Sequence, residues 1–434
     1  MTFRRALGPF DATMVVIGGI IGSGIFINPY LVARSLDTPW LVLAAWTAGG
    51  LVAIAGAFCY AELGRLLPRA GGQYVYLREA WHPLAGFLYG WALLFMIETG
   101  AMAAVAITFA QYALRLAGVT GVSTRPLAIA TIVVLTIINY VGVKPGSRVL
   151  NIFVILKVAA LAALIGLAWL HAAAPDWLTA GRIDDTPSDA LAFGAALIPI
   201  LFAYGGWQNA NYVAEEMREP QRHLPFSLIV GTLTVVAIYL LVNVAYLRAL
   251  GLPGLAATTT PAADAVGRWL GASGDRFISA AIAISTFGFL NLAVLAPTRV
   301  YYAMAADGAF FPALAKLHPR FQTPGAAIVM QSIWAIALAI TGEYGELLET
   351  VVFADWIFFG LTVAGLFVLR PRLGGGAAGY RAPGYPWLPA FFVLVAVIVV
   401  FSTIRADPAR QAVGAGLLLL GVPVYYLFKR RRHA

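Results

Sequence analysis

The chain has 434 residues, of which 61% are hydrophobic and only 11% are charged. Soluble globular proteins are typically about 45–50% apolar and about 25% charged, so the composition excludes an ordinary soluble enzyme. It also excludes a disordered chain, because disorder requires low hydrophobicity and high charge. The apolar residues must therefore face lipid, or one another, across a bilayer.

Long apolar runs recur along the whole chain, and each is long enough to cross a membrane as a helix. Transmembrane β-barrels instead show short segments of alternating polarity. We therefore expect an all-α integral membrane protein with about 12 transmembrane helices. The predicted helices are 10–34, 40–64, 84–117, 126–142, 149–171, 190–213, 224–248, 276–305, 325–341, 347–369, 387–404 and 411–428. The first run is too long for a cleaved signal peptide and carries Asp11.

The net charge of +9 could suggest a nucleic-acid partner, but the placement of the charges does not. If the N-terminus is cytoplasmic, most of the 29 Lys and Arg residues fall in cytoplasmic loops or in the basic C-terminal tail. The positive-inside rule then predicts a multi-pass protein with both termini in the cytoplasm. We expect the lipid bilayer as a partner and no nucleic acid.

Metal and redox chemistry have no support in the sequence. The single cysteine, Cys59, excludes an intrachain disulfide, and the five histidines form no HExxH pair. We expect no metal and no cofactor. The loops are too short for a separate soluble domain, so residues 1–434 are predicted to form one membrane domain.

Two predicted helices are interrupted by glycines at corresponding places. The first contains GGIIGSGIF over Gly18–Phe26, and the sixth contains FAYGGW over Phe202–Trp207. Paired broken helices in two halves indicate a transporter binding site, although glycine also serves close packing between membrane helices. The two halves would be inverted repeats at about 8–171 and 190–370, followed by two further helices at about 387–428.

The two breaks suit a zwitterion. A half-helix that begins after Ser23 presents free N–H groups and a positive dipole end, which fits a carboxylate. A half-helix that ends near Tyr204 presents free carbonyls, which fit an ammonium group. Neither break contains an acid, so neutral substrates are favoured. Glu98 and Asp355 lie within predicted helices and could change this, as a proton site or as members of structural ion pairs.

Lys157 lies within the fifth predicted helix, with no acid nearby in the sequence. An intramembrane lysine is a functional-site hypothesis, and the alternative is snorkelling of its side chain to the membrane surface. Lys157 could carry a transported proton, or it could hold a fixed positive charge where a sodium ion would otherwise bind.

Four stretches of the chain resemble the amino acid–polyamine–organocation superfamily, and within it most closely the L-type amino acid transporter family. They are Ile20–Phe26 (IIGSGIF), Cys59–Gly64 (CYAELG), Phe202–Trp207 (FAYGGW) with Glu215–Met217 (EEM), and Arg299–Ala305 (RVYYAMA) leading to His318–Arg320 (HPR). The resemblance implies a leucine-transporter fold with a five-plus-five inverted repeat, discontinuous helices 1 and 6, and alternating access around a midplane site.

The resemblance also implies roles for individual residues. Backbone groups of Gly22, Ser23 and Gly24 would bind the substrate carboxylate, those of Phe202, Ala203 and Gly205 would bind the amine, and the Phe202 side chain would act as a gate. The full predicted substrate-binding set is Ile21, Gly22, Ser23, Gly24, Ile25, Phe202, Ala203, Tyr204, Gly205 and Gly206. Lys157 matches a helix-five lysine of many sodium-independent members, and Ser285 and Thr286 would lie near that same ion site by analogy.

The chain departs from the family pattern at two places. It lacks the cysteine between helices three and four that links some members to a single-span glycoprotein, so we expect no disulfide-linked heavy chain. This absence favours a bacterial inner membrane. Gln208 follows Trp207 where many L-type members carry asparagine, which leaves the side-chain selectivity open.

The leading hypothesis is sodium-independent transport of neutral L-amino acids, by exchange. The alternative is a proton-coupled symporter of the same substrates or of small cationic amines, with Glu98, Asp355 or Lys157 carrying the proton. A receptor is disfavoured because the sequence contains no signalling domain. An enzyme is disfavoured because no Ser/His/Asp or metal constellation occurs at membrane depth.

Overall fold

A computed structural model describes residues 5–69, 71–141, 147–171, 177–178, 190–321, 323–373 and 379–431. Within these ranges the chain consists of helices and short connections, with no β-strand. The helices are α1 Pro9–Ile20, α2 Gly24–Ser35, α3 Pro39–Leu66, α4 Gln73–Ala80, α5 Pro83–Ala92, α6 Glu98–Leu116, α7 Arg125–Val141, α8 Ser147–Leu170, α9 Ala190–Ala203, α10 Asn209–Tyr212, α11 Pro220–Ala257, α12 Pro261–Leu295, α13 Thr298–Ala306, α14 Gly325–Thr341, α15 Tyr344–Leu373, α16 Trp387–Ala406 and α17 Pro408–Arg431. The all-α prediction is confirmed.

Each of the twelve predicted membrane segments is covered by one or two of these helices, and α4 lies between two of the segments. Nine helical segments of the described chain are long and apolar enough to cross a membrane, and three shorter apolar helices accompany them. The shorter ones are Arg125–Val141, Leu191–Ala203 and Gly325–Thr341. The apolar windows of three of these segments are only 33%, 28% and 22% buried within the fold, namely those of Asn151–Leu170, Trp387–Ala406 and Pro408–Lys429. Such exposed apolar helices require a lipid environment, so the protein is an integral membrane protein.

Helices α11 and α12 extend beyond the predicted segments 224–248 and 276–305. Gly251 and Gly271 have positive φ angles of 66° and 63°, and each marks a kink at which the helix changes direction. Glycine adopts this backbone conformation without the steric cost that other residues meet. The predicted segment 276–305 is covered by α12 and α13, which meet at Ala296 and Pro297 and together form the apolar span Pro261–Ala306.

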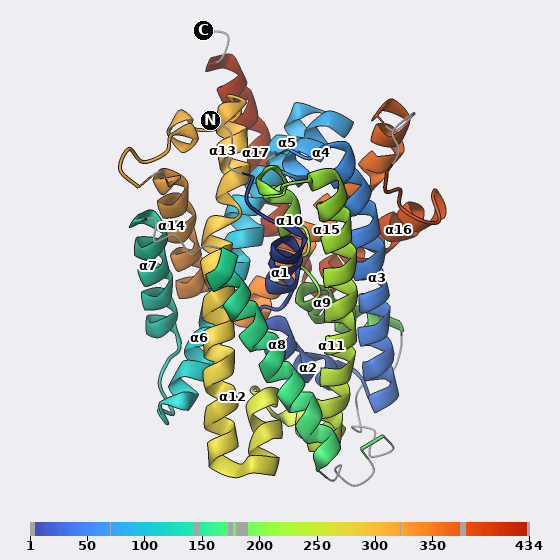
Figure 1. The fold of residues 1–434 in the computed structure, drawn as a ribbon, viewed down its shortest axis with the longest axis vertical. Helices are drawn as coiled ribbons and strands as arrows, with labels where there is room; N and C mark the ends of the chain where they lie inside the picture. The colour runs from blue at the N-terminus through green and yellow to red at the C-terminus, as the bar shows by residue number, and fades with distance from the viewer. Residues whose placement is uncertain are drawn as a thin grey trace.

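The first broken helix lies inside the bundle. Figure 1 shows α1 near the centre of the molecule, with α8 running diagonally below it and α11 on its right. Helix α1 packs against α11 and α8, and α2 packs against α9 and α11. Both breaks are therefore surrounded by other helices, which keeps their unpaired backbone groups away from lipid.

The two ends of the described chain lie toward the same end of the molecule, at the top in Figure 1. The segment preceding α1 lies there, and so does the last turn of α17. An even number of membrane crossings produces this arrangement. The bounds of the inverted repeats, 8–171 and 190–370, and the cytoplasmic side of both termini stay predictions.

Candidate substrate-binding site

The two helix breaks are in direct backbone contact. Helix α1 ends at Ile20 and α2 begins at Gly24, while α9 ends at Ala203 and α10 begins at Asn209. A Cβ atom on Gly24 would lie 2.5 Å from the Cα of Ala203. A Cβ atom on Gly206 would lie 2.1 Å from the carbonyl oxygen of Gly19. Glycine is thus required at these positions because no side chain fits between the two backbones.

The first break leaves hydrogen-bond donors free. In the described structure the backbone N–H groups of Ser23, Gly24 and Ile25 make no hydrogen bond, and the first bond of α2 runs from the Phe26 N–H to the Ser23 carbonyl at 3.0 Å. These donors lie at the positive end of the α2 dipole. Such an end favours a negatively charged group.

The second break leaves acceptors free. The carbonyl oxygens of Ala203 and Tyr204 accept no hydrogen bond from any described residue, although the Phe202 carbonyl accepts one from the Gly205 N–H at 3.1 Å. They lie at the negative end of the α9 dipole, which favours a cation. The two breaks together therefore offer donors on one side and acceptors on the other.

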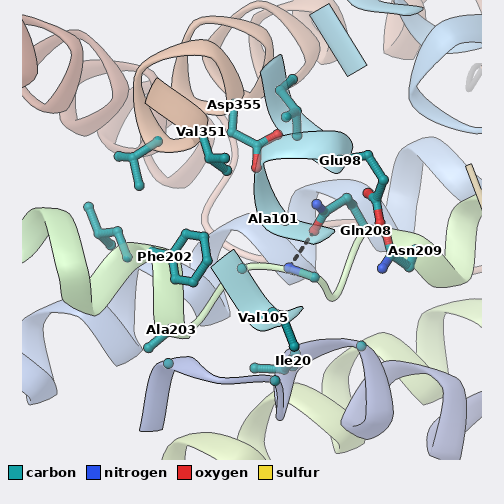
Figure 2. Close-up of a pocket in the computed structure, with 18 of the residues that line it drawn as sticks. Ile20, Glu98, Ala101, Val105, Phe202, Ala203, Gln208, Asn209, Val351 and Asp355 are labelled. Atoms are coloured by element: carbon teal, nitrogen blue, oxygen red, sulfur yellow. Dashed lines mark hydrogen bonds between the residues drawn. The ribbon is translucent and has the colours of Figure 1, made fainter. Parts of the chain in front are cut away.

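A cavity lies between these groups, and helices α6 and α15 close its far side (Figure 2). Part of its wall is apolar and is formed by Val105 of α6, Val351 of α15 and Phe289 of α12. The residues with polar side chains that line it are Ser23, Glu98, Gln208, Asn209 and Asp355. The Gln208 side chain accepts a hydrogen bond from the Gly206 N–H at 2.9 Å, which ties this side chain to the second break.

Glu98 and Asp355 are the acidic residues of this cavity. Glu98 is the first residue of α6, directly after the π-helical turn Leu93–Ile97, and only 6% of it is exposed. Turns of this kind occur frequently at functional sites. Neither carboxylate makes a hydrogen bond or an ion pair with any residue that the structure describes. A structural ion pair, one of the two roles considered for these acids, is thus absent from this part of the molecule.

Comparison with known proteins agrees with this architecture. The family model for amino acid permeases matches residues 7–428, which is nearly the whole chain. The chain belongs to the amino acid permease family.

Several characterised relatives align with the permease over almost its full length. It is 32% identical to the serine/threonine exchanger of Bacillus subtilis (strain 168), with 99% of this chain and 98% of that protein aligned. It is 30% identical to the human large neutral amino acids transporter small subunit 2, over 98% of this chain and 81% of that protein. It is 31% identical to the human b(0,+)-type amino acid transporter 1, with 98% of this chain and 88% of that protein aligned. The chain is a transporter of amino acids and not an enzyme.

Seven members of the predicted substrate-binding set line the cavity of the permease, namely Gly22, Ser23, Gly24, Phe202, Ala203, Gly205 and Gly206. The side chains of Ile21, Ile25 and Tyr204 do not. The Tyr204 ring packs edge-on against Trp46, with ring centroids 5.6 Å apart. The Ile25 carbonyl accepts a hydrogen bond from Tyr246 at 3.3 Å.

Lys157 lies beneath the first break. Its side-chain ammonium donates to the carbonyl oxygens of Ile21 at 2.8 Å and Gly18 at 3.4 Å, and only 2% of the residue is exposed. It does not snorkel to the surface in this structure. The lysine instead satisfies carbonyl groups that the end of α1 leaves unpaired.

The structure buries Ser285 and Thr286 in α12 but joins neither of them to Lys157 by a hydrogen bond. The Thr286 hydroxyl donates to the Ile282 carbonyl of its own helix at 2.8 Å. The Ser285 hydroxyl has no partner among the described residues. Their placement near an ion site stays a prediction.

A cluster of polar contacts connects α2, α9 and α15 beside the cavity. The Tyr344 hydroxyl donates to Asn28 Oδ1 at 2.8 Å and lies 3.4 Å from Ser23 Oγ. Asn28 Nδ2 donates to the Pro199 carbonyl at 2.5 Å. The Phe202 ring, the predicted gate, lies edge-on to Tyr344, with centroids 6.4 Å apart. Sequence reasoning missed Tyr344 and Asn28, because neither belongs to a recognisable motif.

Proposed function

We propose that this permease is a sodium-independent exchanger of L-amino acids, with neutral L-amino acids among its substrates. The observation that carries the proposal is the pair of apposed breaks. Free N–H groups at Ser23 and Gly24 suit an α-carboxylate, and the free carbonyl of Ala203 suits an α-ammonium. Both sets of groups face one cavity, so a single zwitterion could contact them together.

Lys157 supports sodium independence. A sodium ion at the end of α1 would need carbonyl oxygens as ligands. The Lys157 ammonium already occupies those of Ile21 and Gly18. A second cation at the same place would meet the repulsion of this buried positive charge.

Exchange and neutral substrates draw support from different observations. The Bacillus subtilis relative is named an exchanger, and the human relative is named a transporter of large neutral amino acids. The apolar wall of Val105, Phe289 and Val351 would accommodate an uncharged side chain.

The test is uptake of labelled neutral L-amino acids into proteoliposomes containing the purified permease. Vesicles preloaded with unlabelled amino acid are compared with empty ones, in sodium buffer and in potassium buffer. We expect uptake only into preloaded vesicles and equal rates in the two buffers. No uptake above that of protein-free vesicles, for any amino acid, would reject the proposal. A requirement for sodium would reject the role given to Lys157.

Proton-coupled symport is the second candidate, and Glu98 and Asp355 favour it. Both are titratable groups that face the cavity without a described partner. Symport predicts uptake into empty vesicles when the outside is acidified, and loss of this uptake in Glu98→Gln. Uptake that is indifferent to an imposed pH gradient would eliminate this candidate.

The membrane arrangement is proposed as well. We infer that both termini lie in the cytoplasm of a bacterial cell and that the chain resides in the inner membrane without a disulfide-linked heavy chain. The distribution of Lys and Arg supports the orientation. The one cysteine, Cys59, is fully buried in α3, so its thiol is not offered to another protein.

A further inference from the structure

We propose that Glu98 and Asp355, together with the side-chain oxygen of Asn209, form a subsite for a positively charged group at the end of the substrate's side chain. The permease would then bind L-amino acids with a side-chain ammonium or guanidinium more tightly than neutral ones of equal size. This inference rests on the proposed function, because the α-carboxylate and α-ammonium must be held at the two helix breaks.

The first argument is the unpaired burial of Glu98. A carboxylate removed from water needs an ion-pair or hydrogen-bond partner. The fold provides one for Glu62, which is fully buried in α3 and contacts Arg370 at 3.0 Å. Ala382 also donates its backbone N–H to Glu62 at 2.7 Å. Glu98 is buried almost as deeply and receives neither kind of contact from a described residue, so a partner from outside the protein fits there.

The second argument is the Asn209 side chain, which is independent of the two acids. Only 3% of Asn209 is exposed, and its Oδ1 has no hydrogen-bond partner in the described structure. In Figure 2 the Glu98 side chain extends toward Asn209. An amide oxygen beside a carboxylate accepts hydrogen bonds from the same donor group. An ammonium or a guanidinium carries several donors and no acceptor, and therefore matches this set.

The third argument is the position of these acceptors within the cavity. The breaks that face the α-groups belong to α1, α2 and α9, whereas Glu98 and Asp355 belong to α6 and α15. All of these elements line the same cavity, so a substrate held at the breaks would direct its side chain toward the acids. Lys157 does not line the cavity, and its ammonium is bound to Ile21 and Gly18, so it does not neutralise these acids from within.

L-Lysine and L-norleucine test the subsite, because lysine has the carbon skeleton of norleucine with an ammonium in place of one hydrogen of the terminal methyl group. Their inhibition constants are measured against exchange of one labelled amino acid in proteoliposomes. Hydrogen bonds to charged groups are worth about 1.5–3 kcal/mol, so we expect the wild type to prefer lysine by about 10- to 150-fold. Glu98→Gln and Asp355→Asn should each reduce this ratio at least about fivefold. Glu343→Gln, an exposed acid that does not line the cavity, should leave the ratio unchanged.

The remaining outcomes are also decisive. Equal inhibition by lysine and norleucine in the wild type would overturn the subsite and leave amino acid exchange standing. A ratio that stays constant in both variants would overturn it too, because the acids would then serve the α-ammonium or the fold. A response to a pH gradient with no preference for lysine would assign the acids to protons alone. No binding of either amino acid would reject the proposed function itself. Thermal stabilisation of the detergent-purified variants by norleucine confirms that they are folded.

Discussion

Replacing Gly206 by alanine tests whether the two helix breaks must touch for the site to exist. Gly206 has a φ angle of 103°, a conformation that residues with a Cβ rarely adopt. An added Cβ would lie 2.1 Å from the Gly19 carbonyl oxygen and 2.6 Å from the Gly19 carbonyl carbon. Both contacts are to backbone, so no side-chain rotation can relieve them.

The expected cost follows from these two effects. Holding a residue with a Cβ in a sparsely populated backbone region costs about 1–3 kcal/mol. Overpacking a close contact costs about a further 1–3 kcal/mol. A sum of about 2–6 kcal/mol is a large part of the 5–15 kcal/mol by which proteins are typically stable. Part of this strain should be relieved by separation of α1 from α9, which moves the free N–H and carbonyl groups apart and weakens substrate binding.

The assay is thermal unfolding of the detergent-purified permease, with and without a transported amino acid, alongside its exchange rate in proteoliposomes. Gly205→Ala is the matched control at the same break, since its nearest contact would be the Phe202 carbonyl at 3.2 Å. Gly345→Ala, with no atom within 4 Å, is the control for the substitution itself. We expect Gly206→Ala to unfold several degrees lower than either and to lose stabilisation by substrate. Wild-type unfolding and affinity in Gly206→Ala would refute the backbone contact.

Three further substitutions address the other parts of the site. Gly24→Leu should abolish substrate binding, because its Cβ would lie 2.5 Å from the Ala203 backbone; wild-type affinity would contradict the carboxylate placement. Lys157→Ala should stop exchange in a protein that still folds, because the carbonyl oxygens of Ile21 and Gly18 lose their hydrogen-bond donor. Normal exchange rates would show that the buried ammonium is dispensable. Tyr344→Phe removes a hydroxyl whose hydrogen bond to Asn28 connects α15 to α2. We expect the affinity for substrate, measured by competition, to fall about 2- to 10-fold. An unchanged affinity would show that this hydrogen bond does not support the binding site.

The sequence alone determined the class of the protein and the positions of its breaks. Apolar length identifies a membrane helix, and it is a local property of the chain. The glycines of the first break are local signals as well, because a residue without a side chain permits an interrupted helix and a close approach. Gly251 and Gly271 carried no such signal, since a glycine in a membrane segment also serves packing against a neighbour.

Only the tertiary structure decided what the breaks face. Membrane helices are apolar on most sides, so the sequence does not indicate which side of a helix turns toward a cavity. Glu98 and Asp355 are far apart in the chain, and the packing of α6 and α15 brings them to one cavity. The same packing turns the Tyr204 ring away and leads the Lys157 ammonium to the end of α1. These placements depend on contacts between distant segments, and such contacts arise only when the helices pack together.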